Sequence, residues 1–234
     1  MSKVTGDVKF IHRYNRTAIL GISGSPKTGG NTDRMVRAVL QKSGKETDFI
    51  NLSTLRFDPC RGCCHLCAST SMCGVKDELH PYLPLVRDAE ALVLGTPIQL
   101  GMPTGFMFSF LTRLGCFHHI HIALAEKPAV LISAGCKKQE LQVNEGMARF
   151  EQMVAHSKQI RPLGHIYFHS ESPPCLRCGE GQHCMVGAYW KYVIEQDEDR
   201  LNSIQVSTDL IRHWEDNPHT VEQVELYGNI LKEL

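Results

Sequence analysis

The stretch from Thr17 to Thr32, "TAILGISGSPKTGGNT", carries the clearest signal of the fold of this chain. Its first half is an apolar run that ends in small polar residues, as a buried parallel strand does where it opens into a loop. Apolar residues then recur with helical spacing from Met35 to Leu40. Asn31 or Thr32 can cap the start of that helix. The stretch therefore predicts a strand, a glycine-rich loop and a helix in that order.

The same alternation continues along the chain. Further strands are expected at 47–52, 90–96, 127–135 and 159–168, and the helices between them at 78–87, 107–114 and 143–154. Alternating strands and helices predict an α/β fold with a doubly wound, mostly parallel sheet. After a loop rich in proline, glycine and cysteine, helical spacing returns over 189–214 and again over 221–231.

Length and composition favour one main domain. The chain has 234 residues, of which 42% are hydrophobic, so it can bury one sizeable core. We expect an N-terminal extension at 1–16, a main domain at 17–170 that contains a cysteine-rich loop at 59–73, and a segment at 171–234 with a second cysteine-rich loop and C-terminal helices.

Charge and hydropathy exclude several classes of partner. Lys plus Arg and Asp plus Glu number 25 each, without the basic cluster that nucleic acid attracts. The N-terminus lacks the features of a signal peptide, and no stretch is long and apolar enough to cross a bilayer. We therefore expect a cytoplasmic protein that binds neither nucleic acid nor membranes. In that reducing compartment its ten cysteines indicate metal binding or redox chemistry rather than disulfides.

The glycine-rich loop at 21–32 offers an anion site, because backbone N–H groups and the start of a helix face outward there. Ser23, Ser25, Asn31 and Thr32 add side-chain donors, and Lys27 adds a positive charge. Neither a Walker loop nor a dinucleotide fingerprint is present, so a mononucleotide phosphate fits best. The alternative is a simple glycine-rich turn before a capped helix. A second loop, "GTPIQLGMPTG" at 95–105, follows the expected third strand at the same edge, where open α/β sheets bind ligands.

Two cysteine groups have the spacing of metal ligands. The stretch 59–73, "PCRGCCHLCASTSMC", holds five cysteines. Thiolates suit zinc or an iron–sulfur cluster, and free or redox-active thiols are the alternative. The candidate ligands in this stretch are Cys60, Cys63, Cys67 and Cys73, with Cys64 as an alternative to Cys63. The second group is Cys175, Cys178 and Cys184, whose fourth ligand would be His183, Cys136 or Cys116; structural or redox thiols are again the alternative.

The motifs together resemble a known family. "SGSPKTGGNT", "PCRGCCHLC", "CGVKDEL", "GTPIQLGMPTG" and "FLTRL", in this order over about 17–190, are similar to the flavodoxin-like NAD(P)H-dependent FMN reductases and, within them, to the iron–sulfur flavoproteins. The resemblance implies a five-stranded parallel sheet of order 2-1-3-4-5 that binds FMN. It assigns the phosphate to Ser23, Ser25, Lys27, Asn31 and Thr32, the ribityl chain and ring to Pro97, Ile98, Gln99 and Gly101, and closure of the pocket to Ser133 and Gly135.

The resemblance also implies a [4Fe–4S] cluster in the loop after the second strand. Cys63 is favoured over Cys64 because "CRGC" keeps the family's phase, although one extra residue precedes Cys67. The chain departs from the family at Gln99, where an aromatic residue is usual, and at Phe108 and Thr112, where Lys and Asp are often found.

A flavin beside a cluster would link two-electron and one-electron carriers. The expected function is thus electron relay between a ferredoxin-like carrier and FMN or a small-molecule acceptor, in a homodimer or homotetramer. One alternative is an NAD(P)H-dependent FMN or quinone reductase without a cluster. Another is a zinc-stabilised binding or redox-sensing module without turnover. A second iron–sulfur or zinc site at Cys175, Cys178 and Cys184 is compatible with each.

Overall fold

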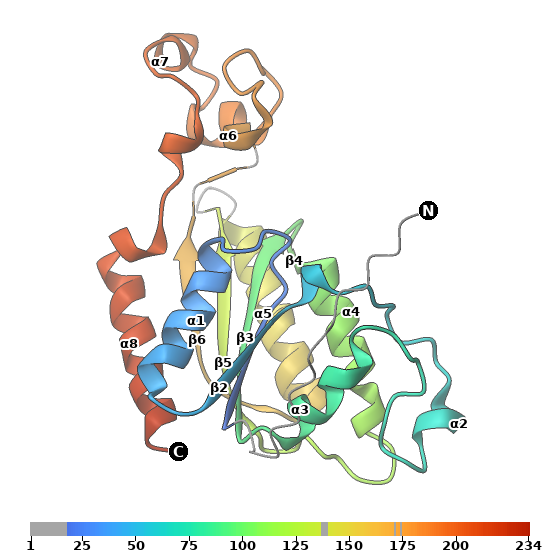
Figure 1. Cartoon of the computed structure of the whole chain (residues 1–234). Coiled ribbons are helices and arrows are strands. Elements are labelled where there is room, and N and C mark those ends of the chain that lie inside the picture. The colour runs from blue at the N-terminus through green and yellow to red at the C-terminus, as the bar shows by residue number, and fades with distance from the viewer. Residues whose placement is uncertain (1–17, 137–139, 171, 174) are drawn as a thin grey trace, which may run out of the picture.

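A computed structural model describes residues 18–136, 140–170, 172–173 and 175–234. The expected extension at 1–16 lies outside these residues. Five parallel strands form the sheet in the order β2-β1-β3-β5-β6 (Figure 1), which confirms the predicted order 2-1-3-4-5 of the parallel strands. Their bounds are β1 Ile19–Ser23, β2 Thr47–Asn51, β3 Ala91–Gln99, β5 Pro128–Gly135 and β6 Arg161–His169. The two-residue strand β4, Met102–Pro103, pairs antiparallel with the end of β3.

Helices cover both faces of the sheet. On one face, α1 (Asn31–Ser43) and α8 (Pro218–Lys232) pack on a core that includes Val93 and Ile132. On the other, the core includes Leu92 and Leu131. Here the covering helices are α3 (Leu83–Asp88), α4 (Gly105–Arg113) and α5 (Glu140–Lys158). Successive residues of a strand point to opposite faces, so strands buried on both sides read as continuous apolar runs.

The region after β6, where helical spacing was found over 189–214, consists of several short helical segments. It contains a short π-helix at Tyr189–Val193, α7 at Glu198–Asn202 and single turns at Thr208–Leu210 and Trp214–Asp216. Glu195 and Gln196 both have φ of 64°, a left-handed backbone that ends a right-handed helix. The helical spacing over 189–214 therefore corresponds to short helices separated by a break at these two residues, not to one continuous helix.

Residues 172–173 and 175–211 form a small unit that we call the C-terminal module. It stands above the carboxyl edge of the sheet (Figure 1) and includes α6, Cys175–Cys178. Its own core consists of five buried residues, Leu176, Tyr189, Trp190, Ile194 and Leu201. Within the described ranges, no helix has the length and apolar character needed to cross a bilayer.

Candidate functional site

A cavity of about 730 Å³ lies at the carboxyl edge of the sheet, and we call it the large cavity. Eight of the eleven predicted FMN contacts line it: Ser25, Lys27, Asn31, Thr32, Pro97, Ile98, Gln99 and Gly135. The C-terminal module adds Arg177 and Tyr192, and Cys136 follows β5 into the same wall. Neither Arg177 nor Tyr192 was predicted, because both reach the cavity from a segment outside the repeating pattern of strands and helices.

The glycine-rich loop is organised by a buried carboxylate that sequence reasoning missed. Asp33, in the first turn of α1, accepts hydrogen bonds from Ser23 Oγ at 2.5 Å and from the Gly29 N–H at 2.9 Å. It also accepts from Asn51 Nδ2 at 2.8 Å, at the end of β2. Ser23 is therefore buried behind the loop and does not line the large cavity. Its hydroxyl helps to fix the loop through its hydrogen bond to Asp33.

The loop presents Lys27 and Asn31 in different ways. The Lys27 side chain is exposed, while its backbone is held by two hydrogen bonds with Ser25 Oγ. A slight loss of solvation, followed by the positive charges of Arg177 and Arg34, lowers the pKa of Lys27. Asn31 instead uses its side-chain amide to hold the C-terminal segment, donating from Nδ2 to the Arg212 carbonyl at 2.9 Å. Lys27 is thus the loop's free cation among the described contacts.

Two other predicted contacts lie away from the large cavity. Gly101 has φ of 70°, and its carbonyl accepts from Arg149 Nη1 of α5 at 2.7 Å. Ser133 is fully buried, with its Oγ 2.8 Å from His165 Nε2 of β6. Burial lowers the pKa of His165 to about 4, so this ring is neutral at neutral pH. Gly101 and Ser133 therefore do not line the large cavity, and their contacts are with residues of α5 and β6.

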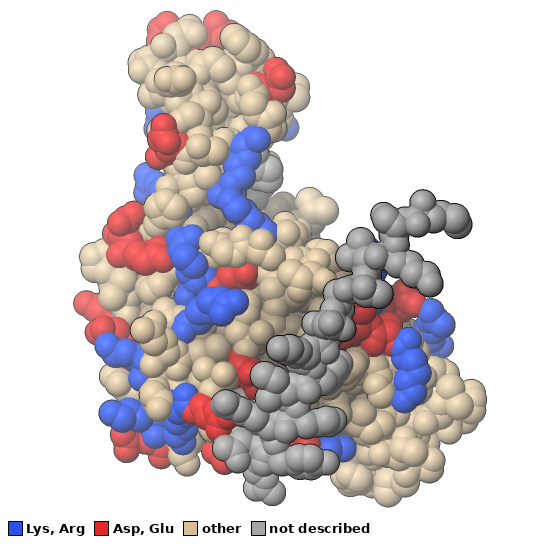
Figure 2. All heavy atoms as spheres, viewed as in Figure 1, with Lys and Arg blue, Asp and Glu red and all other residues tan. Residues whose placement is uncertain are grey.

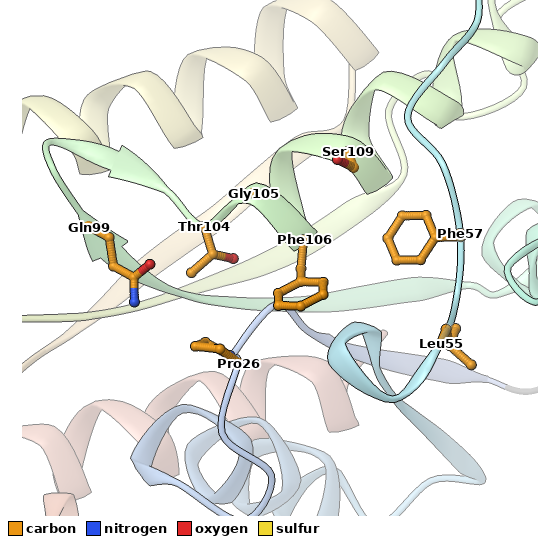
Figure 3. Close-up of a pocket in the computed structure, with 8 residues that line it drawn as sticks. All are labelled: Pro26, Leu55, Phe57, Gln99, Thr104, Gly105, Phe106 and Ser109. Carbon is orange, nitrogen blue, oxygen red and sulfur yellow. The ribbon is translucent and has the colours of Figure 1, made fainter. Parts of the chain in front are cut away.

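A second pocket of about 350 Å³ adjoins the large cavity, and we call it the aromatic pocket (Figure 3). Pro26 and Gln99 line both. Phe57 comes from the segment that leads from β2 to the first cysteine loop, and Phe106 comes from α4. This pocket therefore lies between the large cavity and the segment that carries the first cysteines.

The first cysteine loop packs against the main core. Cys67 at the end of α2 (Cys64–Cys67) and Cys73 are buried, whereas Cys60 and Cys64 are exposed and Cys63 is half-buried. Cys116, a sixth thiol, joins the same core cluster, and burial raises its pKa to about 12. Among the described residues, no group of three His, Cys, Asp or Glu side chains is gathered as ligands of one metal ion. An iron–sulfur cluster binds its thiolates through several iron atoms. The ligand sulfur atoms must therefore lie farther apart than those around a single metal ion.

Arg113 of α4 braces both ends of this loop. Its side chain is fully buried and donates to the Asp58 carbonyl at 2.9 Å, to Asp77 Oδ2 at 2.5 Å and to Cys73 Sγ at 3.1 Å. Burial alone would raise the pKa of Asp77, but hydrogen bonding to Arg113 holds it below its usual value. The buried cation also offsets negative charge that a thiolate at Cys73 would bring.

The second cysteine group lies inside the C-terminal module. Each of its sulfurs accepts a backbone N–H: Cys175 from Tyr189 at 3.4 Å, Cys178 from Glu180 at 3.4 Å and Cys184 from Gly187 at 3.2 Å. A Cβ atom on Gly187 would lie 2.9 Å from the sulfur of Cys175 and 3.0 Å from that of Cys184. The chain therefore needs glycine where it passes these two sulfurs.

Comparison with known proteins identifies the family. The model for NADPH-dependent FMN reductase matches residues 17–156. The chain belongs to the NADPH-dependent FMN reductase family. The match covers all the sheet strands except β6, together with the glycine-rich loop and the first cysteine loop.

Curated relatives of this family member include archaeal iron–sulfur flavoproteins. One from Methanocaldococcus jannaschii is 36% identical over 86 residues, covering 36% of this chain and 44% of the relative. One from Methanosarcina thermophila is 27% identical over 120 residues, covering 50% and 62%. The chain thus spans about half the length of the curated relatives that it matches.

Solved structures with the same fold include an NAD(P)H:quinone oxidoreductase from Methanothermobacter marburgensis. It has a TM-score of 0.54 and 9% identity, and the match covers 92% of this chain and 95% of that one. A flavone reductase has a TM-score of 0.52 and 17% identity, with 92% of this chain and 62% of that one covered. At these identities the likeness shows the flavodoxin-like fold alone.

Proposed function

We propose that this family member is an iron–sulfur flavoprotein that relays electrons between a one-electron carrier, such as a ferredoxin, and FMN or a small acceptor. The observation that carries the proposal is the first cysteine loop. Its four candidate ligands lie in a loop that a buried arginine ties to the core, beside a pocket that adjoins the large cavity. The names of the archaeal relatives support the same assignment.

The large cavity fits FMN in volume and chemistry. Ligand cavities of this class measure about 300–1,000 Å³ and combine apolar walls with a few polar anchors. Pro97 and Ile98 supply apolar wall, while Lys27 and Arg177 supply positive charge for a phosphate. When bound, FMN supplies hydride or single-electron transfer. The residues of the chain bind and orient it, and Gln99 stands where the family usually has an aromatic residue.

The first cysteine loop fits a [4Fe–4S] cluster in its donor set. Cys60, Cys63, Cys67 and Cys73 are the four soft ligands, and such a cluster supplies one-electron transfer when bound. Arg113 holds Cys73, and the Thr112 hydroxyl accepts from the Cys60 N–H at 3.1 Å, so α4 positions the first and last ligands. The half-buried Cys63 is a better inward ligand than the exposed Cys64.

A small acceptor would bind in the aromatic pocket, where Phe57 and Phe106 offer flat apolar surfaces. The pocket shares Pro26 and Gln99 with the large cavity, so an acceptor there would lie against the same wall as the flavin. A planar aromatic compound such as a quinone matches this lining.

Two other functions make different predictions. An NAD(P)H-dependent FMN reductase without a cluster is favoured by the family match, and would contain flavin without iron. A zinc-stabilised module would contain neither. In the second cysteine group, the three sulfurs that accept backbone N–H groups support an additional zinc or iron–sulfur site at Cys175, Cys178 and Cys184.

Serine substitutions in the first loop test the proposal. Under anaerobic conditions, Cys60→Ser, Cys63→Ser, Cys67→Ser and Cys73→Ser should each lower the iron content at least severalfold and leave the FMN content unchanged. Cys64→Ser is the matched control and should retain iron. If all five variants keep wild-type iron, or if Cys64→Ser loses iron and Cys63→Ser keeps it, the ligand assignment is wrong.

A further inference from the structure

A short loop at 118–122, which we call the histidine loop, plays no part in the proposed function so far. It holds three histidines: His118, His119 and His121. The loop follows Phe117, whose carbonyl accepts from the Ala123 N–H at 3.1 Å. His118 is also bonded, with its Nε2 3.1 Å from the carbonyl of Lys158 at the end of α5. The base of the histidine loop is therefore fixed to the main domain, and His119 stands next to this base.

His119 reaches the first cysteine loop. Its Nε2 lies 3.1 Å from the sulfur of Cys67, although the two residues are 52 positions apart in the sequence. His119 is exposed and Cys67 is buried, so the ring lies on the solvent side of the sulfur. The contact therefore connects a residue outside the cysteine-rich stretch to one of the four candidate ligands.

The direction of this hydrogen bond depends on the state of Cys67. As a free thiol, Cys67 can donate its proton, and the Cys64 carbonyl is a further acceptor 3.5 Å from the sulfur. A cysteine that binds iron is a thiolate, which has no proton and can only accept. A carbonyl cannot donate either, so the N–H of His119 is the donor once Cys67 is a ligand. A neutral ring is sufficient, because it carries one N–H.

The two buried ligands of the first cysteine loop then each have a side-chain donor. Arg113 Nε donates to Cys73 at 3.1 Å from the core, and His119 faces Cys67 from the solvent side. Hydrogen bonds to ligand sulfurs stabilise the additional negative charge of a reduced cluster and raise its potential. Figure 2 shows that the surface around α2 is largely free of charged side chains, so stronger charges do not mask a neutral donor there.

We propose that His119 is a positioning residue of the iron–sulfur centre, whose ring donates from Nε2 to the Cys67 sulfur and raises the reduction potential of that centre. The inference rests on the proposed function in one respect, namely that Cys67 is a cluster ligand. The redox step is the gain of one electron from the one-electron carrier, and the proton stays on Nε2 throughout. His119 thus favours the reduced state without binding iron.

Reductive titrations of the whole chain, purified without oxygen, test the inference. Electron paramagnetic resonance of the reduced cluster gives the midpoint potential, and iron and sulfide analysis of the same samples gives the cluster content. His119→Ala should lower the equilibrium constant for one-electron reduction at least about threefold, which is about 28 mV at about 59 mV for each factor of ten. Its iron content should not change.

Two further variants complete the test. His119→Gln keeps a side-chain N–H that can reach the sulfur, and should restore at least half of the lost potential. His121→Ala, at another exposed position of the histidine loop, is the matched control and should keep the wild-type potential.

A wild-type potential in His119→Ala would overturn the inference, as would equal shifts in His119→Ala and His121→Ala. Equally lowered potentials in His119→Ala and His119→Gln would show that the ring covers the sulfur without a hydrogen bond, and would also refute it. Loss of iron in His119→Ala would make the ring a part of the cluster's attachment rather than a donor, with the same consequence. A wild-type chain without iron refutes the proposed function itself, and the iron analysis shows this before any titration.

Discussion

The two cysteine-rich regions are built in opposite ways. In the first loop, Cys67 and Cys73 belong to the main core and are joined there by Cys116 from the turn after α4. In the C-terminal module, the cysteines lie beside a separate core of five residues, and Cys178 is exposed. The first loop is thus a part of the main domain, whereas the module has a small core of its own.

The two groups of thiols are therefore expected to act on different parts of the molecule. A metal centre in the first loop would be fixed by the same packing that fixes the sheet, and Arg113 is the connection. The module has few buried residues, and small units of that kind usually depend on a metal or disulfide for stability. We therefore expect changes at its cysteines to affect the position of Arg177, which lies between two of them on α6, more than the stability of the sheet.

The largest expected effect is that of Arg113→Met, which removes the brace of the first loop. It leaves the Asp77 carboxylate and the Asp58 carbonyl without their buried donor, and such losses cost about 3–5 kcal/mol. Urea denaturation should show this loss in the free energy of unfolding, together with lower iron content. Arg87→Met, which breaks an exposed ion pair with Asp88, should change the unfolding free energy by less than about 1 kcal/mol. Equal effects of the two variants would refute the bracing role.

The second prediction concerns how the free energy of unfolding depends on pH. The group responsible is His165 of β6, which lies outside both cysteine-rich regions. Burial lowers the pKa of His165 from 6.5 to about 4, so the unfolded chain takes up a proton over this interval before the folded chain does. Stability should be complete above pH 6.5 and fall as the pH drops towards 4, by up to about 3 kcal/mol.

The variant His165→Gln should flatten this pH dependence in urea titrations, because glutamine is neutral throughout. His156→Gln, at an exposed position of α5, is the control and should keep the wild-type slope. Wild-type slopes in both variants would show that His165 is not the titrating group.

The smallest effect is expected from Ile→Val substitutions, made once in the core of the sheet and once in the core of the C-terminal module. Ile22→Val in β1 and Ile194→Val in the module each remove one buried methylene group, at a cost of about 1 kcal/mol. Ile22→Val should lower the free energy of global unfolding. Ile194→Val should speed hydrogen exchange within the module and leave the global transition unchanged. If both variants shift the global transition equally, the module and the sheet unfold as one unit.

Much of the fold could be predicted because the parallel strands are buried on both faces and therefore read as apolar runs between helical patterns. The module could not, since Glu195 and Gln196 adopt left-handed conformations that their residue types do not signal. At the site, loop residues such as Ser25 and Lys27 could be predicted, because they lie between the first strand and the first helix of the sequence pattern. Asp33 and Arg177 could not be predicted. Asp33 acts through a buried hydrogen-bond network, and Arg177 reaches the cavity from a segment distant in the sequence.

The most direct test of the central proposal is the cofactor content of the whole chain purified without oxygen. Iron, acid-labile sulfide, zinc and FMN should be measured per chain on the same sample. If the protein is an iron–sulfur flavoprotein, we expect about four iron atoms and about four sulfide ions for each FMN. The sample should be brown, and Cys73→Ser should remove this colour. A yellow protein with one FMN and no iron would contradict the proposal in favour of a reductase without a cluster.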